Sequence, residues 1–307
     1  MKALVTGGAG FIGSHLTRRL IGDGHDVTVI DDLSTGRREN LSATNTRLVV
    51  ADLSSDPLDE LVQKVDVVFH LAAVPSVPRS VAEPLRSHQA AATSTLRLLD
   101  AARNAGVGTF VNSSSSSVYG NVAKPPMREA MPTLPRSPYA VAKLAAEGYT
   151  RVFANLYGMR TVSLRYFNVF GPRQDPTSAY AAAIPRFITA YVRREPPKVY
   201  DDGRQSRDFT YVANVVEANV LAARAPQLEG ESINVAAGEP RSVLDLLHAI
   251  AEVFGYWLEP TFLPARPGDI RDSHADISLA RELLHYKPVT GFAEGLRETI
   301  DWLRDKG

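Results

Sequence analysis

The sequence predicts an α/β fold: a doubly wound parallel sheet of the Rossmann type, with a smaller, loop-rich C-terminal part. Three observations support this prediction. Short, valine-rich apolar runs alternate with helical patterns over about the first 110 residues. A glycine-rich turn, Thr6–Gly13, separates the first apolar run from the first helical pattern. From about Gly171 onward, segments rich in proline, aspartate and arginine indicate loops.

Six apolar runs are expected to form the strands of the sheet. They lack the alternation of a one-sided strand, which is typical of parallel strands that are covered on both faces. In chain order they are Ala3–Val5, Val27–Ile30, Leu48–Val50, Val65–Phe69, Thr109–Val111 and Thr161–Tyr166.

Helical patterns lie between these runs and continue toward the C-terminus. We expect residues 1–170 to form the cofactor-binding domain, and residues 171–307 mainly a substrate-binding region from which some chain returns to the first domain. The serines at 113–117 are the one stretch with the composition of a linker. The expected helices are Ile12–Gly22, Pro84–Asn104, the segment that carries Tyr139, Ala181–Val192, Val212–Ala223, Ser242–Phe254 and Phe292–Arg304.

Composition excludes several classes of function. The chain has 307 residues, a formal net charge of +0 and no cysteine, so disulfides and thiolate catalysis are excluded. The neutral balance argues against a nucleic-acid-binding or membrane-surface protein. No histidine pair has helical ligand spacing, so no metal site is expected. The first residues run directly into a strand, and no apolar run approaches the ~20 residues that span a bilayer. We expect a cytoplasmic protein.

The glycine-rich turn predicts a dinucleotide site. Gly7, Gly10 and Gly13 allow a tight turn, the approach of a pyrophosphate and close packing of the helix on the sheet. Phe11 and Ile12 open the helix, whose N-terminus attracts phosphate. Asp31 ends the second strand, where a carboxylate accepts hydrogen bonds from the adenosine ribose and repels a 2′-phosphate, which favours NAD over NADP. Arg37 and Arg38 are close enough to weaken that preference.

Further cofactor contacts are expected at the ends of the strands. Asp52 either binds the adenine amino group or caps the end of the third strand. His70 is interpreted as a packed residue at the end of the fourth strand, and small residues after it would let the main chain pass a flat cofactor. The predicted contacts also include Asp32, Leu53, Leu71, Ala72, Ala73 and Tyr166.

Tyr139 and Lys143 form a candidate catalytic pair. They stand four residues apart, and therefore on one face of the predicted helix. A phenol with a pKa near 10 is a poor base at neutral pH, but an adjacent ammonium stabilises the phenolate and makes it a usable proton acceptor. We therefore expect Lys143 to lower the pKa of Tyr139.

Together these motifs resemble the extended short-chain dehydrogenase/reductase family over essentially the whole chain. The resemblance comprises TGGAGFIG, Asp31, HLAA, the serine run, Tyr139-x-x-x-Lys143 and RYFNVFG. Within that family the chain looks most like the UDP-sugar 4-epimerases. The resemblance implies a permanently bound NAD that oxidises carbon 4 of the sugar and returns hydride to the opposite face. It also implies that Tyr139 takes the C4 hydroxyl proton and that Ser115 hydrogen-bonds the same oxygen.

Ser116 and Ser117 favour epimerisation over elimination. Family dehydratases carry Asp-Glu at these two positions, and decarboxylases carry a glutamate at the second. Elimination needs its own acid and base, which serine does not readily supply at neutral pH. A lyase of the same fold stays an alternative, as does a dinucleotide-sensing regulator, although such regulators tend to lose the tyrosine or the lysine.

The resemblance also assigns residues to the UDP-sugar. Arg207 and Arg266 correspond to a diphosphate clamp, a task suited to bidentate donors, and Asp269 to a ligand of the uridine ribose. Ser273 corresponds to a position that controls pocket size; a small residue there leaves room for an N-acetyl group, so UDP-GlcNAc and UDP-GalNAc are expected substrates beside UDP-glucose and UDP-galactose. The remaining predicted substrate contacts are Ser76, Ser115, Asn168, Ala183, Ile184, Val199 and Tyr200.

Three further expectations come from the same comparison. A UDP-glucuronate 4-epimerase stays possible, although such enzymes often have arginine where this chain has Asp175. The chain departs from the family at Ala91, in a segment that usually contains asparagine, and at Asn214, where aspartate is usual. Relatives pair the helices at about 84–104 and 137–157, so a homodimer is expected.

Overall fold

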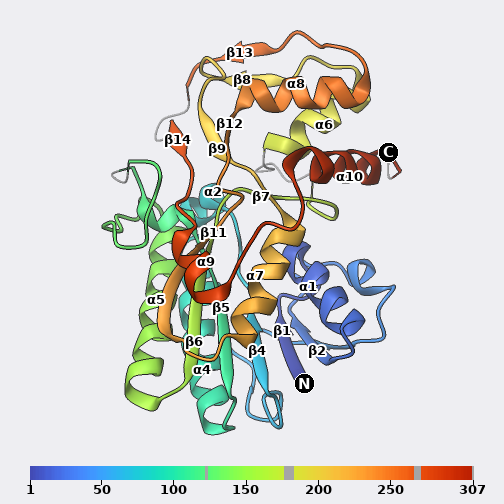
Figure 1. The fold of residues 1–307 in the computed structure, drawn as a ribbon. Coiled ribbons are helices and arrows are strands. Elements are labelled where there is room, and N and C mark those ends of the chain that lie inside the picture. The colour runs from blue at the N-terminus through green and yellow to red at the C-terminus, as the bar shows by residue number, and fades with distance from the viewer. Residues whose placement is uncertain (122–123, 176–182, 266–270, 306–307) are drawn as a thin grey trace.

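The computed structural model describes residues 1–121, 124–175, 183–265 and 271–305. Its centre is a seven-stranded sheet with the strand order β11-β6-β5-β4-β1-β2-β3, and every neighbouring pair is parallel (Figure 1). The predicted α/β fold is confirmed. The chain fills the sheet outward from β1 to β3, then returns to β4 and continues in the opposite direction. In such sheets, ligands bind where the strand order reverses, beyond the carboxyl ends of the strands.

Six strands of the sheet correspond to the six predicted runs. They are β1 (Lys2–Thr6), β2 (Asp26–Asp31), β3 (Arg47–Val50), β4 (Val67–His70), β5 (Thr109–Ser115) and β6 (Arg160–Tyr166). β5 extends through three residues of the serine run, so the interpretation of that run as a linker was wrong. The seventh strand, β11 (Glu229–Val235), was not predicted, and it pairs with β6 across a long sequence separation.

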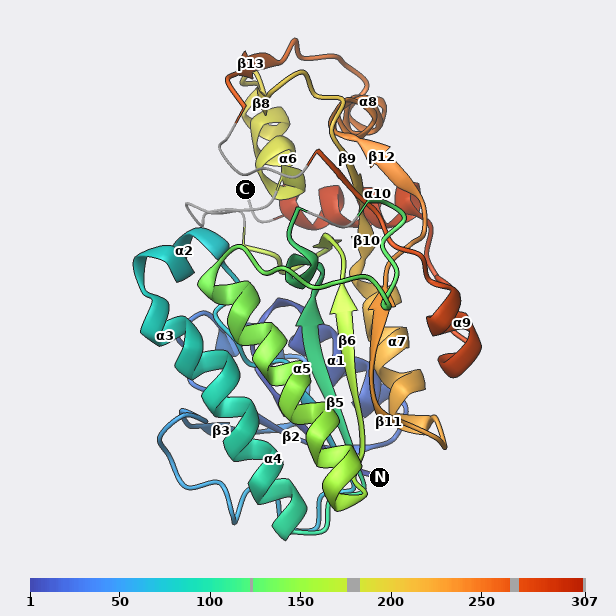
Figure 2. The ribbon, with the colours of Figure 1, turned by 90° about the vertical axis from the view of Figure 1, so that its left-hand side faces the viewer.

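Helices cover both faces of the sheet. α1 (Phe11–Gly22), α7 (Val212–Arg224) and α9 (Ser278–Leu284) lie on one side, and α4 (Ser94–Asn104) and α5 (Pro138–Tyr157) lie on the other (Figures 1 and 2). Ser137 caps α5 by accepting a hydrogen bond from the Ala140 main chain, and Pro138 occupies its first turn. This capping fixes the start of α5 immediately before Tyr139.

The helix predicted over 84–104 is interrupted. The chain forms α3 (Pro84–His88), then a π-helical turn over Gln89–Thr93, and then α4. A short helix that was not predicted, α2 (Val77–Ala82), precedes them. A π turn leaves carbonyl groups poorly paired, and the hydroxyls of Ser94 and Thr95 donate to the carbonyls of Ala90 and Ala91 there.

The C-terminal part contributes three helices above the carboxyl edge of the sheet: α6 (Ala183–Arg193), α8 (Val243–Phe254) and α10 (Phe292–Arg304) (Figure 1). They enclose a core of their own that includes Ile188, Tyr191 and Leu247. Short strands complete this part: β7 (Val169–Phe170), β8 (Lys198–Tyr200), β9 (Ser206–Asp208), β10 (Thr210–Tyr211), β12 (Pro240–Ser242), β13 (Thr261–Leu263) and β14 (Asp272–Ser273).

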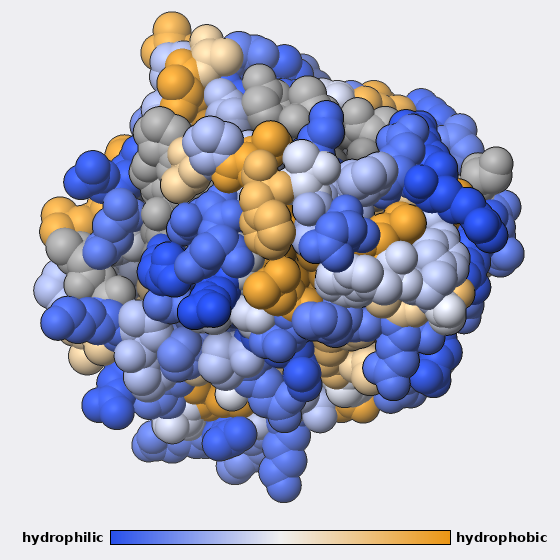
Figure 3. All heavy atoms as spheres, turned by 90° about the horizontal axis from the view of Figure 1, so that it is seen from above, coloured by the Kyte–Doolittle hydropathy of each residue, from blue (hydrophilic) through white to orange (hydrophobic). Residues whose placement is uncertain are grey.

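The upper surface of the molecule is mainly hydrophilic, with hydrophobic atoms in a narrow central strip and a few small groups (Figure 3). Within the described residues, no helix combines the length and the apolar character that crossing a bilayer requires.

Candidate functional site

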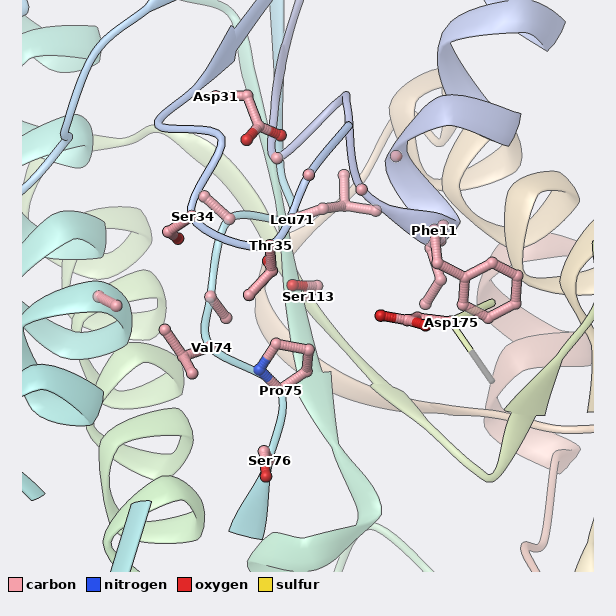
Figure 4. A pocket seen from close by; sticks show the side chains of 18 of the residues that line it. Phe11, Asp31, Ser34, Thr35, Leu71, Val74, Pro75, Ser76, Ser113 and Asp175 are labelled. Carbon is pink, nitrogen blue, oxygen red and sulfur yellow. The ribbon is translucent and has the colours of Figure 1, made fainter. Parts of the chain in front are cut away.

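A cavity of about 1030 Å³ opens at the carboxyl ends of the strands, beside the point where the strand order reverses (Figure 4). This volume is large for a ligand pocket and suits a molecule the size of a dinucleotide. The structure brings all the predicted cofactor residues, the predicted catalytic residues and two further predicted substrate contacts into its wall. They are Gly7, Gly10, Phe11, Ile12, Gly13, Asp31, Asp32, Asp52, Leu53, Leu71, Ala72, Ala73, Ser76, Ser115, Tyr139, Lys143, Tyr166 and Asn168.

The glycine-rich turn fits the predicted cofactor. Gly7 has a φ of +68°, and a Cβ there would lie 2.7 Å from the main-chain nitrogen of Ala72. A Cβ at Gly13 would lie 2.1 Å from the carbonyl oxygen of Gly7. Larger residues would therefore push the turn away from β4 and from α1. The resulting narrow turn brings the amino end of α1 to the cavity, where a pyrophosphate would receive main-chain hydrogen bonds.

Two of the predicted acidic residues organise the loops around the cavity. The buried Asp31 accepts hydrogen bonds from the main-chain nitrogens of Ala9 and Leu33, both at 2.9 Å. Burial raises the pKa of Asp31, and these two hydrogen bonds act in the opposite direction. Asp52 accepts from the Ser54 main chain and hydroxyl, which lowers the pKa of Asp52. Asp52 therefore caps the end of β3, and it also lines the cavity.

Tyr139 lies in the first turn of α5 and reaches the cavity beside Ser115, the last residue of β5. Burial raises the pKa of the Tyr139 phenol, and a hydrogen bond with Ser115 lowers it to a smaller extent. The Ser115 hydroxyl also interacts with Ser117, accepting from its main-chain nitrogen at 3.2 Å. The end of β5 thus places a hydroxyl group directly against the phenol.

Lys143 lies one helical turn after Tyr139, and it too is buried. Its ammonium donates to the Ser113 carbonyl at 2.7 Å and to the Ser113 hydroxyl at 3.2 Å. Burial lowers the pKa of Lys143 to about 8, while Glu147 acts to raise it. The structure therefore differs from the expectation for Tyr139: its pKa is raised by burial, and the group that opposes this is Ser115.

His70 is a packed residue, as interpreted from the sequence. Its ring nitrogens pair with the hydroxyls of Thr6 at 2.7 Å and Thr95 at 3.0 Å. Burial lowers the pKa of His70 to about 3, so the ring is neutral near pH 7. Both ring nitrogens are used, and the side chain joins β1, β4 and α4.

Arg173 also lines the cavity and was not predicted. It follows Pro172, whose carbonyl accepts from His15 Nε2 at 2.8 Å, so α1 holds this loop. The buried Nε of Arg173 has no hydrogen-bond partner among the described residues. Burial, together with the charge of Arg18, lowers the pKa of Arg173 to about 10. The Arg173 guanidinium, with the positive charge of Arg18 on α1 near it, favours an anion in this part of the cavity.

The sequence contained a weak signal for Arg173, namely an arginine directly after a Gly-Pro pair near the end of a short strand. Other wall residues that sequence reasoning missed come from the loop after β2 and from α10. They include Ser34, Thr35, Trp302 and Leu303.

The remaining predicted substrate residues are not part of this cavity wall. Ile184 and Val199 are buried in the C-terminal core. Arg207 and Ser273 are neighbours in register on β9 and β14. Ala183 begins α6, and Tyr200 ends β8 with Arg186 over its ring. Arg266 and Asp269 lie outside the described residues.

No group of three or more histidine, aspartate or glutamate side chains in the described parts of the chain has the arrangement of a metal site. The cavity is built instead from main-chain turns, hydroxyls, a phenol and an ammonium. These groups are suited to holding a phosphate-containing ligand and to moving a proton.

Comparison with known proteins agrees with this description. Residues 3–236 match the NAD dependent epimerase/dehydratase family. A curated relative, the UDP-glucose 4-epimerase of Mycolicibacterium smegmatis, is 43% identical over 313 residues, which cover 100% of this chain and 99% of the relative.

Two solved structures extend the comparison. A UDP-N-acetylglucosamine 4-epimerase from Methanobrevibacter ruminantium M1, in complex with UDP-N-acetylmuramic acid, is 44% identical with a TM-score of 0.96, and covers 100% of this chain and 99% of that one. A UDP-glucuronic acid 4-epimerase from Bacillus cereus, with UDP-glucuronic acid and NAD, is 34% identical with a TM-score of 0.91, and covers 100% of both chains.

Proposed function

The chain belongs to the NAD-dependent epimerase/dehydratase family, and we propose that it interconverts UDP-sugars that differ in configuration at carbon 4. The observation that carries the proposal is the meeting of Tyr139, Ser115 and Lys143 in the wall of one dinucleotide-sized cavity. When bound, NAD supplies the oxidant at carbon 4 and the reductant that restores it.

The residues of the chain supply the proton chemistry of the proposed reaction. Tyr139 removes the proton from the C4 hydroxyl and later returns it. Ser115, which already hydrogen-bonds the phenol, orients the same oxygen. Lys143 keeps a positive charge one helical turn away, which stabilises the phenolate as it forms. This role requires Lys143 to stay protonated, and its pKa of about 8 permits that near neutral pH.

Ser116 and Ser117 support epimerisation over elimination. Both follow Ser115 directly in a 3-10 turn, and Ser116 lines the cavity. Removal of a C5 proton and loss of a C6 substituent each need an acid or a base at these positions, and a serine hydroxyl is neither near pH 7. A lyase reaction would therefore lack its catalytic groups.

We further propose that the enzyme accepts N-acetylated sugars. Ser273 is a small, buried residue beside Arg207, and a small side chain at this position leaves space for the acetamido group. Purified protein should convert UDP-GlcNAc to UDP-GalNAc as well as UDP-glucose to UDP-galactose, with products identified by NMR. UDP-galactose without any UDP-GalNAc would contradict the N-acetyl assignment alone, and no 4-epimer from either substrate would contradict the function.

A Ser273→Tyr variant tests the pocket itself. The larger side chain should abolish conversion of UDP-GlcNAc and retain that of UDP-glucose, because only the former carries the acetamido group. Ser273→Ala is the matched control and should keep both activities. A thermal unfolding curve establishes that the tyrosine variant is folded.

Asp175 argues against a glucuronate as the preferred substrate. It lines the cavity and lies 3.4 Å from Arg37, from its carboxylate oxygen to the guanidinium nitrogen. An arginine at this position could pair with a carboxylate on carbon 6 of the sugar, whereas Asp175, itself paired with Arg37, supplies no positive charge for it. Including UDP-glucuronate in the NMR assay tests this, and a turnover above that of UDP-glucose would overturn it.

We propose that two copies of the chain associate through α5 and the neighbouring α2 and α3. Exposed apolar side chains follow one face of α5 at 141, 149, 152 and 156, and a second row occurs at 77, 81 and 85. In a dimer with a two-fold axis, the same apolar face of each subunit contacts the other and is removed from water. Sedimentation should show a dimer, and Leu156→Glu, at a residue 70% exposed, should weaken it.

A further inference from the structure

A buried ion pair lies beneath the catalytic residues. Arg165 on β6 donates from Nε to Glu147 Oε1 at 2.9 Å and from Nη2 to Oε2 at 2.7 Å. Both side chains are 4% exposed. Glu147 lies one turn after Lys143 on α5, so Tyr139, Lys143 and Glu147 follow one another at intervals of four residues along the helix.

The carboxylate of this pair holds two strands through serine hydroxyls. Ser114 of β5 donates to Glu147 Oε1, and Ser232 of β11 donates to Oε2 at 3.0 Å. Ser114 immediately precedes Ser115, and Lys143 holds Ser113 on its other side. The two residues that directly precede Ser115, the residue that contacts the Tyr139 phenol, are therefore both fixed to α5.

The guanidinium continues the network toward the C-terminal part. Arg165 Nη1 pairs with the Tyr119 hydroxyl at 2.9 Å, and that hydroxyl donates to Asn234 Oδ1 at 2.8 Å. Asn234 Nδ2 donates to the Met127 carbonyl at 2.9 Å. The Met127 main chain in turn donates to the His274 carbonyl, beside Ser273. One network thus connects the catalytic helix with the proposed substrate pocket.

Stability alone is a weak reason for such a pair. Taking two charges out of water is costly, and well-packed apolar residues are often at least as stabilising. The hydrogen bonds of this pair are made, and its negative member, Glu147, lies one helical turn from Lys143. Inside a protein, where screening by water is weak, a charge one helical turn away affects the protonation of a buried ammonium.

We propose that Glu147 and Arg165 are positioning residues for proton transfer: the pair holds the end of β5 against Tyr139 and sets the local charge that keeps Lys143 protonated. The proposal rests on the proposed function insofar as Tyr139 and Lys143 are the proton-transfer pair. Neither Glu147 nor Arg165 lines the described cavity, so both act through other residues.

The expected electrostatic effects have opposite signs. Removing the negative charge of Glu147 lowers the pKa of Lys143, because burial then acts without its counterweight. Removing the positive charge of Arg165 leaves Glu147 unneutralised and raises the pKa of Lys143. His70 is neutral and contributes little. The titratable or charged groups around Lys143 are Tyr139 and Glu147 on α5, His70 on β4, and Arg165 and Tyr166 on β6.

The experiment measures the titration of Lys143 by NMR in ¹⁵N-lysine-labelled holoenzyme, with the signal assigned by a Lys143→Met variant. Glu147→Gln should lower the Lys143 midpoint by about one pH unit or more, and Arg165→Gln should raise it by a similar amount. Arg165→Lys keeps the charge and should change it little. The alkaline limb of kcat should move in the same directions.

Shifts of the same sign in the glutamine variants, or no shift in either, would overturn the proposal. The NMR titration does not depend on turnover, so inactive wild-type protein would contradict the proposed function and leave this proposal testable.

A second, milder pair of variants covers the case in which the charge variants do not fold. Ser114→Ala and Ser232→Ala each remove one hydroxyl donor to Glu147. Only Ser114 belongs to the end of β5, whereas Ser232 belongs to β11. Ser114→Ala should lower kcat roughly tenfold with KM and NAD content unchanged, and Ser232→Ala should leave kcat unchanged. Equal effects of the two substitutions on kcat would overturn the positioning role.

Discussion

At the scale of single residues, the ionisation of the Tyr139 phenol depends on the groups that surround it. Burial raises the pKa of the phenol, so the neutral form predominates at pH 7. The phenolate forms at neutral pH only when hydrogen bonds and a nearby positive charge offset the effect of burial. Ser115 supplies the hydrogen bond. In the proposed reaction, the ammonium of Lys143 supplies the positive charge that stabilises the phenolate.

Replacing Tyr139 by phenylalanine tests this role. We expect turnover to fall by roughly 10²–10⁴-fold, the usual contribution of acid–base catalysis, because the ring remains while the proton acceptor is lost. Bound NAD, measured after denaturation of the protein, should be unchanged. Tyr157→Phe, at the far end of α5, is the control and should stay active. Full activity of the Tyr139 variant would contradict the proposed chemistry.

Arg173 is expected to contribute to cofactor affinity. Its Nε has no hydrogen-bond partner in the described parts of the chain, and Arg173 and Arg18 together leave an excess of positive charge beside α1. Arg173→Met should weaken NAD binding by roughly 10- to 100-fold, as expected for the loss of one charge-assisted hydrogen bond of about 1.5–3 kcal/mol. Calorimetric titration of NAD into the stripped protein measures this.

Arg103→Met provides the matched control for that titration. Arg103 lies over the Tyr157 ring, outside the described cavity wall, and its replacement should leave the NAD affinity unchanged. Equal affinities of wild type and the Arg173 variant would show that Arg173 does not contact the cofactor.

At the scale of elements, the π turn at 89–93 shows how a helix forms part of a cavity wall. It interrupts the predicted helix and brings Ala90 and Ser94 into the lining. Ala91 and Ala92 pack against Ala142 of α5. The small residue at 91 therefore suits close approach of this turn to α5, in the segment where the family resemblance led us to expect an asparagine.

Asn214 on α7 stands where the family resemblance led us to expect an aspartate. Its Oδ1 accepts from the main chains of Val289 at 2.7 Å and Thr290 at 2.9 Å, and its Nδ2 donates to the Thr290 carbonyl at 2.9 Å. An aspartate could accept but could not donate when ionised. The amide thus ties α7 to the segment that leads into α10.

Asn214→Asp should consequently destabilise the protein by about 1–3 kcal/mol at pH 7, because a carboxylate oxygen would face the Thr290 carbonyl. Urea denaturation measures the free energy of unfolding. Asn104→Asp, at the end of α4, is the control and should be neutral. An unchanged or increased stability of the Asn214 variant would mean that the loop rearranges to suit a carboxylate.

At the scale of the whole molecule, two histidines that hold elements together are expected to make the fold acid-sensitive. His15 and His70 have pKa values lowered to about 3, against 6.5 in the unfolded chain. Between these values the unfolded state binds more protons, so stability rises with pH; it is fully present above pH 6.5 and lost as the pH falls toward 3.

At pH 5 the loss should be about 2 kcal/mol for His70 and less for the half-buried His15, relative to pH 8. Urea unfolding at pH 5, 6, 7 and 8 measures this slope. His70→Gln should flatten it, and His88→Gln, at the exposed end of α3, should not. A His70→Gln protein with the wild-type slope would place the acid sensitivity elsewhere.

The two parts of the chain are also interdependent. β11 and α7 come from the C-terminal half, yet β11 completes the main sheet and α7 packs against α1. Asp208 adds a further connection, because its buried carboxylate accepts from the main chains of Ala237 and Gly238 and so holds β9 to the end of β11. The C-terminal part is therefore built onto the sheet itself.

The sequence by itself determined the features that depend on neighbouring residues. The strand, glycine turn and helix from Lys2 to Gly22, the start of α5 after Ser137 and the one-turn spacing of Tyr139 and Lys143 all arise from local hydrogen bonding and helical periodicity. The assignment of these motifs to an NAD-dependent family followed from the same residues.

Only the tertiary structure decided the features that depend on distant pairing. β11 joins β6 across the chain, the serines of β5 find their partners on α5, and Arg173 reaches the cavity through a loop held by His15. Packing likewise decided that Ile184 and Val199 face the C-terminal core. No local pattern encodes such contacts, because their free energy is gained only when segments far apart in sequence close on one another.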